Sequence, residues 1–199
     1  MKWLSPLRAV IVCTAMLLIF FGYAHFGKPY AFFGTPLAGQ PAPPLHLQSD
    51  ENRPFSLSAR HGRAVLVYFG YTHCPDVCPT TLAALHAVFA QLSQPDARQV
   101  DVVFVTLDPV RDTPSLLRAY LAAFDPVPIG LTGSARDVAR TASDWGVSCQ
   151  LVDDGEFINH TSVITLVGPD GRMRARYGFA QLDNSAAMAG DIRHVLQAE

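Results

Sequence analysis

The sequence predicts an α/β fold in which a central mixed sheet has parallel strands first and an antiparallel hairpin last. Two apolar runs, Ala64–Phe69 and Val100–Leu107, are rich in β-branched and aromatic residues, as expected of strands covered on both faces. The segment between them, Thr80–Leu92, places apolar side chains at intervals of three and four residues, the pattern of a helix packed on a sheet. This order predicts two parallel strands joined by a right-handed crossover.

The second half of the chain predicts two more helices, a hairpin and a closing helix. The helices are expected over Thr113–Phe124, with a proline in the first turn, and Ser134–Trp145, with serine as the N-cap. Thr161–Val167 and Arg172–Tyr177 flank a Gly-Pro-Asp-Gly turn and predict an antiparallel hairpin. The last helix is expected over 186–197. A βαβ unit followed by a hairpin and a helix is the thioredoxin-like order of elements.

The N-terminal segment predicts a membrane anchor. Residues 9–23 carry no charge, and Phe26 extends the apolar character to about 18 residues, near the lower limit for crossing a bilayer. Lys2 and Arg8 precede this run, which favours a cytoplasmic N-terminus and places the rest of the chain across the membrane. No good cleavage site follows the run in the sequence, so we expect an uncleaved transmembrane helix rather than a signal peptide.

Composition divides the chain into an anchor at 1–28, a tether at 29–54 in which proline and glycine recur, and a folded domain at 55–199. The net charge of -2 offers no basic footprint for nucleic acid. No transit peptide rich in arginine and serine precedes the apolar run, which favours a bacterial over a mitochondrial membrane. We expect a single-pass protein of the bacterial inner membrane whose C-terminal domain lies in the periplasm, where cysteines are oxidised or hold a metal.

The segment YFGYTHCPDVCPTTL carries two cysteines, Cys74 and Cys78, between the first strand and the first helix of the domain. Partial positive charge at a helix start lowers the pKa of a nearby thiol. Residues four apart in a helix have Cα atoms about 6 Å apart, so a disulfide and a shared metal are both open. Three residues intervene, unlike in a C-x-x-C redox enzyme. Tyr71 and Pro75, rather than Thr or Ser, stand three residues before the cysteines, which argues against a peroxiredoxin.

His160 is the third candidate ligand. It stands immediately before the predicted hairpin, where a thioredoxin-like fold brings a loop against the cysteine-bearing helix. A structural zinc site needs four protein ligands, whereas two thiolates and one imidazole suit copper. A histidine at the start of a strand is more often structural, so the residues alone leave both interpretations open. His73 adjoins Cys74 and is expected to point the opposite way on an extended segment.

Taken together, the motifs resemble the Sco family, also called SenC, of copper-binding proteins that assist assembly of cytochrome c oxidase. The matching segments are YFGYTHCPDVCPTTL, VTLDPVRDTP, LTGS and NHTSVITLVGPDG, and they cover most of residues 60–178 in the family's order. The resemblance implies that Cys74, Cys78 and His160 bind copper, as Cu(I), Cu(II) or both, on a thioredoxin-like domain.

The resemblance also implies a function and its partners. An anchored metallochaperone of this family delivers copper, electrons or both to the dinuclear copper centre of cytochrome c oxidase subunit II. Another copper chaperone and a thioredoxin-like reductase are the further partners that this interpretation admits. Oxidation of the two thiols to a disulfide would exclude the metal, so metal loading and redox state compete at this site.

Two other functions remain open. One is an enzyme, a thiol-disulfide reductase in which Cys74 is the exposed nucleophile, Cys78 resolves, and His160 is dispensable. The other is a copper or redox sensor, which the sequence does not separate from the metallochaperone. The metallochaperone is the leading interpretation.

The remaining polar residues near the motif are expected to have supporting roles. By the resemblance, Asp108 and Arg111 lie on a loop that guides partner docking, and neither is expected to bind the metal. Asp112 or Thr113 is expected to cap the following helix. Cys149 lies outside the family's motif and is expected to be an inert buried thiol.

Overall fold

The computed structural model describes residues 6–26, 30–152 and 157–198. The chain forms two compact units, Met1–Ala31 and Phe32–Glu199. The first unit contains α1 (Pro6–Phe26), in the segment predicted as an anchor. Among the described residues no helix is both long enough and apolar enough to cross a membrane, so the predicted transmembrane helix is not found. That prediction relied on an apolar run near the lower length limit for spanning a bilayer.

The second unit is built on a mixed sheet. Within the described part of the chain its strands follow the order β1-β10-β9-β4-β5-β6-β2-β3. The central strands β4 and β5 are parallel, with Ala64 opposite Val100 and Gly70 opposite Thr106. Strand β6 continues the parallel set, and β9 and β10 form the antiparallel hairpin. The bounds are β1 Thr35–Pro36, β2 Leu47–Ser49, β3 Pro54–Phe55, β4 Ala64–Gly70, β5 Val100–Thr106, β6 Ile129–Thr132, β9 Val163–Val167 and β10 Met173–Gly178.

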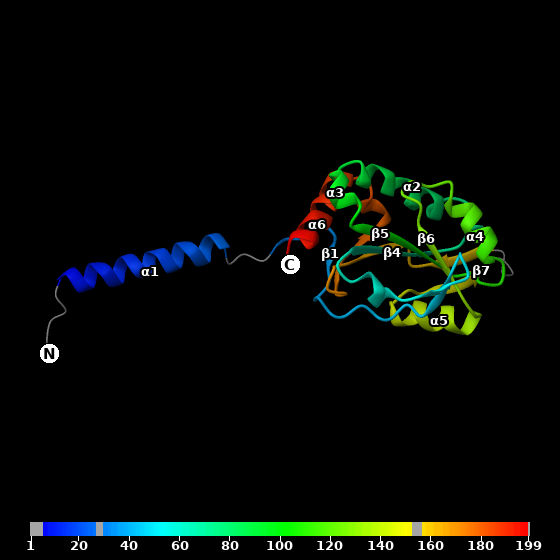
Figure 1. The fold of residues 1–199 in the computed structure, drawn as a ribbon, viewed down its shortest axis with the longest axis horizontal. Coiled ribbons are helices and arrows are strands. Elements are labelled where there is room, and N and C mark those ends of the chain that lie inside the picture. The colour runs from blue at the N-terminus through cyan, green and yellow to red at the C-terminus, as the bar shows by residue number, and fades with distance from the viewer. Residues whose placement is uncertain (1–5, 27–29, 153–156, 199) are drawn as a thin grey trace. The chain divides into compact units, whose positions relative to one another are not determined.

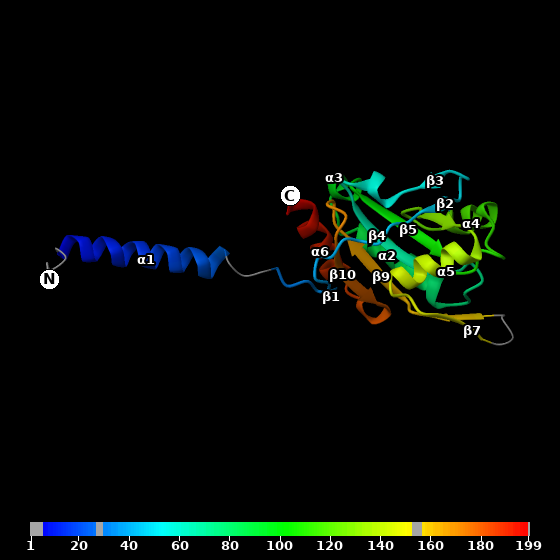
Figure 2. The same cartoon turned by 90° about the horizontal axis from the view of Figure 1, so that it is seen from below.

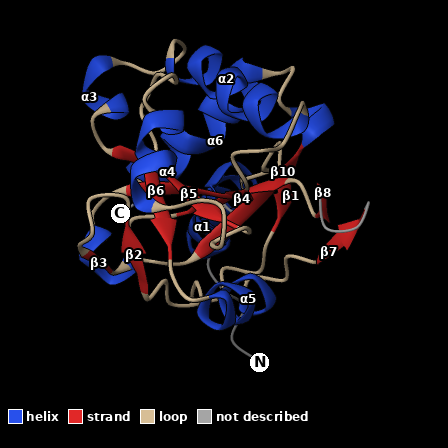
Figure 3. Cartoon of the chain, turned by 90° about the vertical axis from the view of Figure 1, so that its right-hand side faces the viewer, coloured by secondary structure: helices blue, strands red, loops and turns tan. Residues whose placement is uncertain are grey.

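Helices cover both faces of this sheet. Figure 1 and Figure 3 show α2, α3, α4 and α6 on one face and α5 on the other. The helix bounds are α2 Val77–Phe89, α3 Gln94–Ala97, α4 Pro114–Leu121, α5 Ala135–Asp144 and α6 Ser185–Gln197, with short 3-10 turns η1 Leu57–Arg60 and η3 Phe179–Gln181. The predicted βαβ unit, hairpin and closing helix are therefore confirmed.

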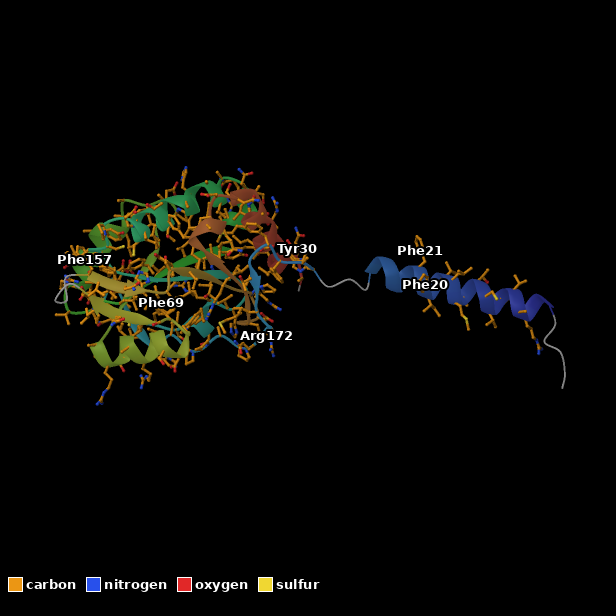
Figure 4. All side chains as sticks on the ribbon, turned by 180° about the vertical axis from the view of Figure 1, so that it is seen from behind. Phe20, Phe21, Tyr30, Phe69, Phe157 and Arg172 are labelled. Carbon is orange, nitrogen blue, oxygen red and sulfur yellow. The ribbon has the colours of Figure 1, made fainter. Side chains whose placement is uncertain are left out.

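A second, two-stranded ribbon lies outside the main sheet. Strand β7 (Cys149–Val152) pairs antiparallel with β8 (Phe157–His160). Figure 2 shows β7 at one end of the domain, and Figure 4 shows Phe157 at the same end, whereas Phe69 lies in the interior. This ribbon was not predicted from the sequence, because four-residue strands outside the main sheet leave little periodic signal.

The region predicted as a tether contributes to the sheet. Strands β1 and β2 fall within residues 29–54, and β3 begins at Pro54. Pro36 and Pro54 lie on the two outermost strands. Proline is tolerated there because an outer strand has one edge without hydrogen-bonding partners in the sheet. Although this segment is rich in proline and glycine, part of it therefore belongs to the folded sheet.

The strand β4 sends alternate side chains to opposite faces of the sheet, as a pleated strand must. Every residue of β4 is buried. Phe69 packs against Trp145, which follows α5, with ring centroids 5.9 Å apart. Tyr68 points to the other face, where its ring lies 5.9 Å from that of Phe104. This second face carries the candidate site.

Candidate metal centre

The two candidate cysteines follow the carboxyl end of β4, the edge at which sites gather in α/β sheets. Cys74 is half-buried in the loop after the strand, and Cys78 is fully buried. Helix α2 begins at Val77, three residues earlier than predicted, so Cys78 lies in its first turn. Pro79 is tolerated in that turn because the first N–H groups of a helix lack intrahelical partners. Both cysteines are free thiols.

A glycine at the end of β4 lets the Cys78 sulfur approach the backbone. A Cβ atom placed on Gly70 would lie 3.0 Å from Cys78 Sγ and 2.9 Å from Cε2 of Phe104. Both neighbouring side chains are fully buried and have little room to move. The absence of a side chain at Gly70 therefore makes the position of the Cys78 thiol possible. This role of Gly70 was not predicted from the sequence.

His160 brings an imidazole nitrogen to the Cys78 thiol. Its Nε2 atom lies 3.6 Å from Cys78 Sγ, and its Nδ1 atom lies 3.2 Å from the carbonyl oxygen of Thr161. A carbonyl only accepts hydrogen bonds, so Nδ1 must carry the proton and donate. The Nε2 lone pair then faces the sulfur, which is the tautomer that a metal-binding histidine needs.

Two tyrosines of the YFGY motif hold the ribbon against β4. The Tyr71 hydroxyl accepts a hydrogen bond from the Ile158 backbone N–H at 3.3 Å. The Tyr68 hydroxyl lies 3.1 Å from Oγ of Ser162. Their rings approach His160 edge-on, with centroid distances of 6.0 Å for Tyr71 and 6.4 Å for Tyr68. Sequence reasoning missed both residues, although their place in the cysteine motif was a usable signal.

The cysteine loop and the ribbon enclose a pocket of about 290 Å³, lined by Tyr71, Cys74, Pro75, Asp76, Val77, Val152, Phe157, Ile158, Asn159, His160 and Ser162. Cys74 and His160 thus share one opening, although 86 positions separate them in the numbering. The N–H of Cys78 donates to Cys74 Sγ at 3.3 Å, which ties the loop thiol to the first turn of α2.

Burial favours the neutral forms of Cys78 and His160. The pKa of the Cys78 thiol is raised to about 12, mainly by burial and in second place by the side chain of Cys74. Burial also lowers the pKa of His160, although the hydrogen bond to Thr161 opposes this effect. The prediction that the helix start lowers thiol pKa values is wrong for Cys78, because there the loss of hydration outweighs that effect. A metal entering this site would have to displace thiol protons.

The structure connects the three predicted ligands through pairwise contacts; Cys74 and His160 line the pocket, and Cys78 is buried behind it. Cys78 contacts His160, and its backbone contacts Cys74. Across residues 6–26, 30–152 and 157–198, however, no group of three or more His, Cys, Asp or Glu side chains is arranged to hold a metal ion. The assignment of Cys74, Cys78 and His160 as a joint metal site therefore stays a prediction.

Asp108 and Arg111 lie beside a second pocket. They form an ion pair, and the Asp108 backbone N–H donates to Oγ1 of Thr106 at 2.9 Å. Asp108 lines a neighbouring pocket of about 410 Å³ together with Val110 and Leu151. Ile158 lines both this pocket and the one that contains Cys74 and His160. The Asp108 loop therefore lies beside the pocket that contains Cys74, and its expected role in partner docking stays a prediction.

Cys149 is exposed, which corrects the expectation that it is buried. It is the first residue of β7, a strand whose first three residues are all exposed, in the two-stranded ribbon outside the main sheet. In the register of the ribbon it stands directly opposite His160. His73 is half exposed, and its Nδ1 atom faces Oγ1 of Thr72 at 3.1 Å.

The family of the chain follows from a comparison with models of known protein families. A model of the SCO1/SenC family matches residues 37–197, most of the chain. The chain belongs to the SCO1/SenC family. The matched range holds the whole cysteine motif and the His160 ribbon, so the resemblance drawn from the motifs is confirmed.

Solved Sco structures share the fold of this SCO1/SenC chain. The copper-bound structure of Bradyrhizobium japonicum ScoI is 32% identical in sequence with a TM-score of 0.69, and the match covers 77% of this chain and 98% of that one. The apo Sco1 structure from Thermus thermophilus is 34% identical with a TM-score of 0.74, covering 83% of this chain and 97% of that one. The thioredoxin-like fold with a central mixed sheet is therefore confirmed.

Curated relatives carry Sco or copper-binding names. The mitochondrial SCO2 homologue of Danio rerio is 39% identical over 138 residues, which cover 67% of this chain and 49% of that protein. A Stutzerimonas stutzeri protein whose name refers to copper binding is 37% identical over 135 residues, 66% of each chain. The chain thus spans between about half and two thirds of these relatives. BsSco, 22% identical, shares the fold and is described as a member of the Sco family of cytochrome c oxidase assembly proteins.

Proposed function

We propose that this SCO1/SenC chain is a copper metallochaperone in which Cys74, Cys78 and His160 hold the cargo. The observation that carries the proposal is the 3.6 Å approach of His160 Nε2 to Cys78 Sγ, with the imidazole lone pair directed at the sulfur. A histidine that served only as packing would not need its basic nitrogen turned toward a buried thiol. The copper bound to the ScoI structure of Bradyrhizobium japonicum supports copper as the cargo.

The donor set suits copper more than other metals. Two thiolates and one imidazole form a soft, three-coordinate set that accommodates Cu(I) and also accepts Cu(II). Structural zinc would require a fourth protein ligand. Among the residues that the structure describes, Asp76 is the one carboxylate that lines the pocket, and its Oδ1 accepts a hydrogen bond from the Thr80 hydroxyl at 3.2 Å.

Loading requires the loss of thiol protons. Cys78 and His160 already face each other, and the Cys74 thiol is held beside Cys78 by the hydrogen bond that it accepts from the Cys78 N–H at 3.3 Å. Cys74 is half-buried and lines the pocket, so a small adjustment of its side chain would complete the ligand set. Thiols bind metals as thiolates and the buried Cys78 thiol has a raised pKa, so copper affinity should rise with pH.

Release follows from the same geometry. An incoming thiolate can reach a three-coordinate copper through the open pocket and replace the ligands one at a time. We propose the dinuclear copper centre of cytochrome c oxidase subunit II as the acceptor. The description of the neighbour BsSco as a member of a family of oxidase assembly proteins supports this choice.

A thiol-disulfide reductase is the second candidate. It is favoured by the difference in exposure between a half-buried Cys74 and a fully buried Cys78, the arrangement of an attacking and a resolving thiol. In that function the two thiols reduce a partner disulfide and are left as a disulfide, which a thioredoxin-like reductase must restore. His160 is not needed for this chemistry, so its role separates the two candidates.

The compartment is part of the proposal. A cysteine pair that is either oxidised or loaded with copper suits a bacterial periplasm, and the cations before the apolar segment favour that orientation. A Bacillus anthracis structural neighbour is described as a SCO1/SenC family lipoprotein. We therefore place the domain at the periplasmic surface of the inner membrane. Alkaline phosphatase fused to the C-terminus should be active in cells, and an inactive fusion would contradict this location.

Copper titration tests the function. The full chain, reduced and kept anaerobic in a mild detergent, is titrated with Cu(I) against a chelator and separately with Cu(II). We expect one copper per chain and a Cu(II)–thiolate charge-transfer band that disappears when Cys74 and Cys78 are both changed to Ser and weakens in His160→Ala. Cys149→Ser is the matched control, because it removes an exposed thiol from the same ribbon, and it should leave binding unchanged.

The same samples separate the rival functions. Copper-loaded protein mixed with the copper-free copper domain of oxidase subunit II should produce the absorption of the dinuclear centre. If wild type holds copper no better than the double Ser variant, the ligand assignment fails. Reduction of a partner disulfide by both wild type and His160→Ala would then establish the reductase.

A further inference from the structure

Asp112 is a fully buried carboxylate beside the cysteine loop. It lies between β5 and α4, and its side chain is 0% exposed. From the sequence, Asp112 or Thr113 was predicted to cap α4. Thr113 is the cap, because its side chain accepts a hydrogen bond from the Leu116 N–H. The Asp112 carboxylate is thus available for a different role.

Its hydrogen bonds run to the loop before Cys74 and to the end of β5. Oδ1 accepts from the Thr72 hydroxyl at 2.5 Å, and Oδ2 accepts from the Thr72 backbone N–H at 3.1 Å. Oδ2 also accepts from the Thr106 hydroxyl at 2.5 Å. His73 Nδ1 stands 3.8 Å from Oδ1, on a side chain that is half exposed. Both carboxylate oxygens therefore hold Thr72, and one of them also holds β5.

Thr72 is part of the turn that carries Cys74. The Cys74 N–H donates to the Tyr71 carbonyl at 3.3 Å, so Thr72 lies inside a turn that closes on the first candidate ligand. Thr106 is the last residue of β5 and stands opposite Gly70, the last residue of β4. The Asp112 carboxylate therefore links the start of the cysteine loop, through Thr72, to the end of β5, through Thr106.

Burying a carboxylate away from water is costly unless hydrogen bonds compensate it. An apolar side chain at this position would avoid that cost, but it could not accept the Thr72 N–H. Tyr71 and Thr72 together connect the loop to both sides of the site: Tyr71 accepts from Ile158 on the ribbon, and Thr72 donates to Asp112. The loop is thus fixed at its start, while Cys74 at its far end remains half-buried.

We propose that Asp112 is a positioning residue for the metal centre: by holding both polar groups of Thr72 against Thr106, it sets the turn that places Cys74 beside Cys78 before copper arrives. This inference rests on the proposed copper function. Asp112 does not touch the metal in this arrangement, and its effect reaches the site through Thr72 and the turn.

A matched control separates positioning from general stability. Asp191 on α6 is also buried, and it accepts from the N–H groups of Phe33 and Gly34, each at 3.1 Å, and from the Tyr177 hydroxyl at 2.8 Å. None of these residues lines the Cys74 pocket. Asp191→Ala therefore removes a comparable buried carboxylate from the same domain without touching the cysteine loop.

The first experiment measures copper binding by the full chain in detergent. Cu(I) affinity is determined by competition with a chelator, and the Cu(II)–thiolate band is recorded, for wild type, Asp112→Ala, Asp112→Asn and Asp191→Ala. Asp112→Ala should lose on the order of 10- to 100-fold in affinity, the usual effect of removing a residue that orients a ligand, and its band should shift. Asp191→Ala should stay within about threefold of wild type, since its carboxylate orients no ligand.

Asp112→Asn is the conservative rescue. Its amide oxygen can accept the Thr72 N–H and the Thr106 hydroxyl, and its NH₂ group can donate to the Thr72 hydroxyl. It should therefore recover most of the affinity that Asp112→Ala loses. Thr72→Val, which removes the hydroxyl but keeps the shape, covers the case in which Asp112→Ala does not fold, and it should weaken copper binding in the same direction.

The second experiment needs no copper. Hydrogen exchange of the copper-free protein is followed in peptides that cover residues 71–78. Exchange there should speed up at least tenfold in Asp112→Ala and Thr72→Val and should not change in Asp191→Ala. The positioning role is overturned if these peptides exchange alike in all variants, or if Asp112→Ala binds copper as wild type does. It is also overturned if Asp112→Asn binds copper as weakly as Asp112→Ala. Failure of wild type itself to bind copper instead refutes the proposed function and leaves the exchange result to decide the role of Asp112.

Discussion

Gly70→Ala tests whether the close approach of Cys78 to the end of β4 is a requirement of the site. The added methyl would lie 2.9 Å from Phe104 Cε2 and 3.0 Å from Cys78 Sγ, closer than real Cβ atoms normally come to either. Phe104 and Cys78 are both 0% exposed, so neither can move aside into solvent. Overpacking of a filled core costs about 1–3 kcal/mol, and we expect the free energy of unfolding to fall by that amount. Displacing the sulfur should also weaken copper binding.

Urea unfolding followed by near-UV circular dichroism measures the first effect, and chelator competition measures the second. Gly178→Ala is the matched control, because it also ends a strand but a methyl there meets only Gln181 Oε1, at 3.8 Å. The control should unfold within about 0.5 kcal/mol of wild type, as surface changes usually do. Equal stability and equal copper binding in the two variants would refute the reasoning, because the close contacts at Gly70 would then not constrain the position of the Cys78 sulfur.

Three further predictions concern the site and its surroundings. Burial lowers the pKa of His160, so the unfolded chain takes up a proton below about pH 6.5 that the folded domain resists. The resulting stability is present above pH 6.5 and is lost as the pH falls through the pKa of His160 in the folded domain. Urea unfolding between pH 5 and 8 should therefore show that the free energy of unfolding falls more steeply on acidification in wild type than in His160→Gln. Parallel curves for the two proteins would contradict this. Burial raises the pKa of Cys78 to about 12, so at pH 8 iodoacetamide should label the exposed Cys149 long before Cys78, and equal labelling by peptide mass spectrometry would show that the burial is wrong. Thr113→Ala removes the N-cap of α4 and should lower the free energy of unfolding by about 1 kcal/mol, with an unchanged urea midpoint as the contrary result.

The sequence predicted the elements that carry strong local signals. The buried runs became β4 and β5 because continuous β-branched and aromatic residues need cover on both faces, and Ser134 became the N-cap of α5, accepting from the Asp137 N–H. The start of α2 was placed three residues late, since Pro79 hid the first turn. The short strands β1, β2 and β3 were missed, because two or three residues provide no periodicity and depend on the sheet they join.

The candidate site was predicted unevenly for a similar reason. The cysteines form a local motif, and the family resemblance singled out His160, which the structure brings to Cys78. The hydrogen bonds from Thr72 to Asp112 span 40 positions, and no pattern in one sequence reports a contact at that separation. The exposure of Cys149 was also missed, because a strand in a separate ribbon looks like any other short apolar run.

The ribbon that carries His160 has a mechanical consequence. His160 and Cys78 are 82 residues apart in the chain, and they belong to different sheets or helices of the domain. A copper ion that joined them as proposed would close a loop of that length, much as a disulfide does. In the chain-entropy treatment of cross-links such a closure is worth about 4.5 kcal/mol of stability. The copper-loaded protein would then be a cross-linked form of the fold. Transfer of the copper would remove the cross-link, so the copper-free protein would have a lower free energy of unfolding.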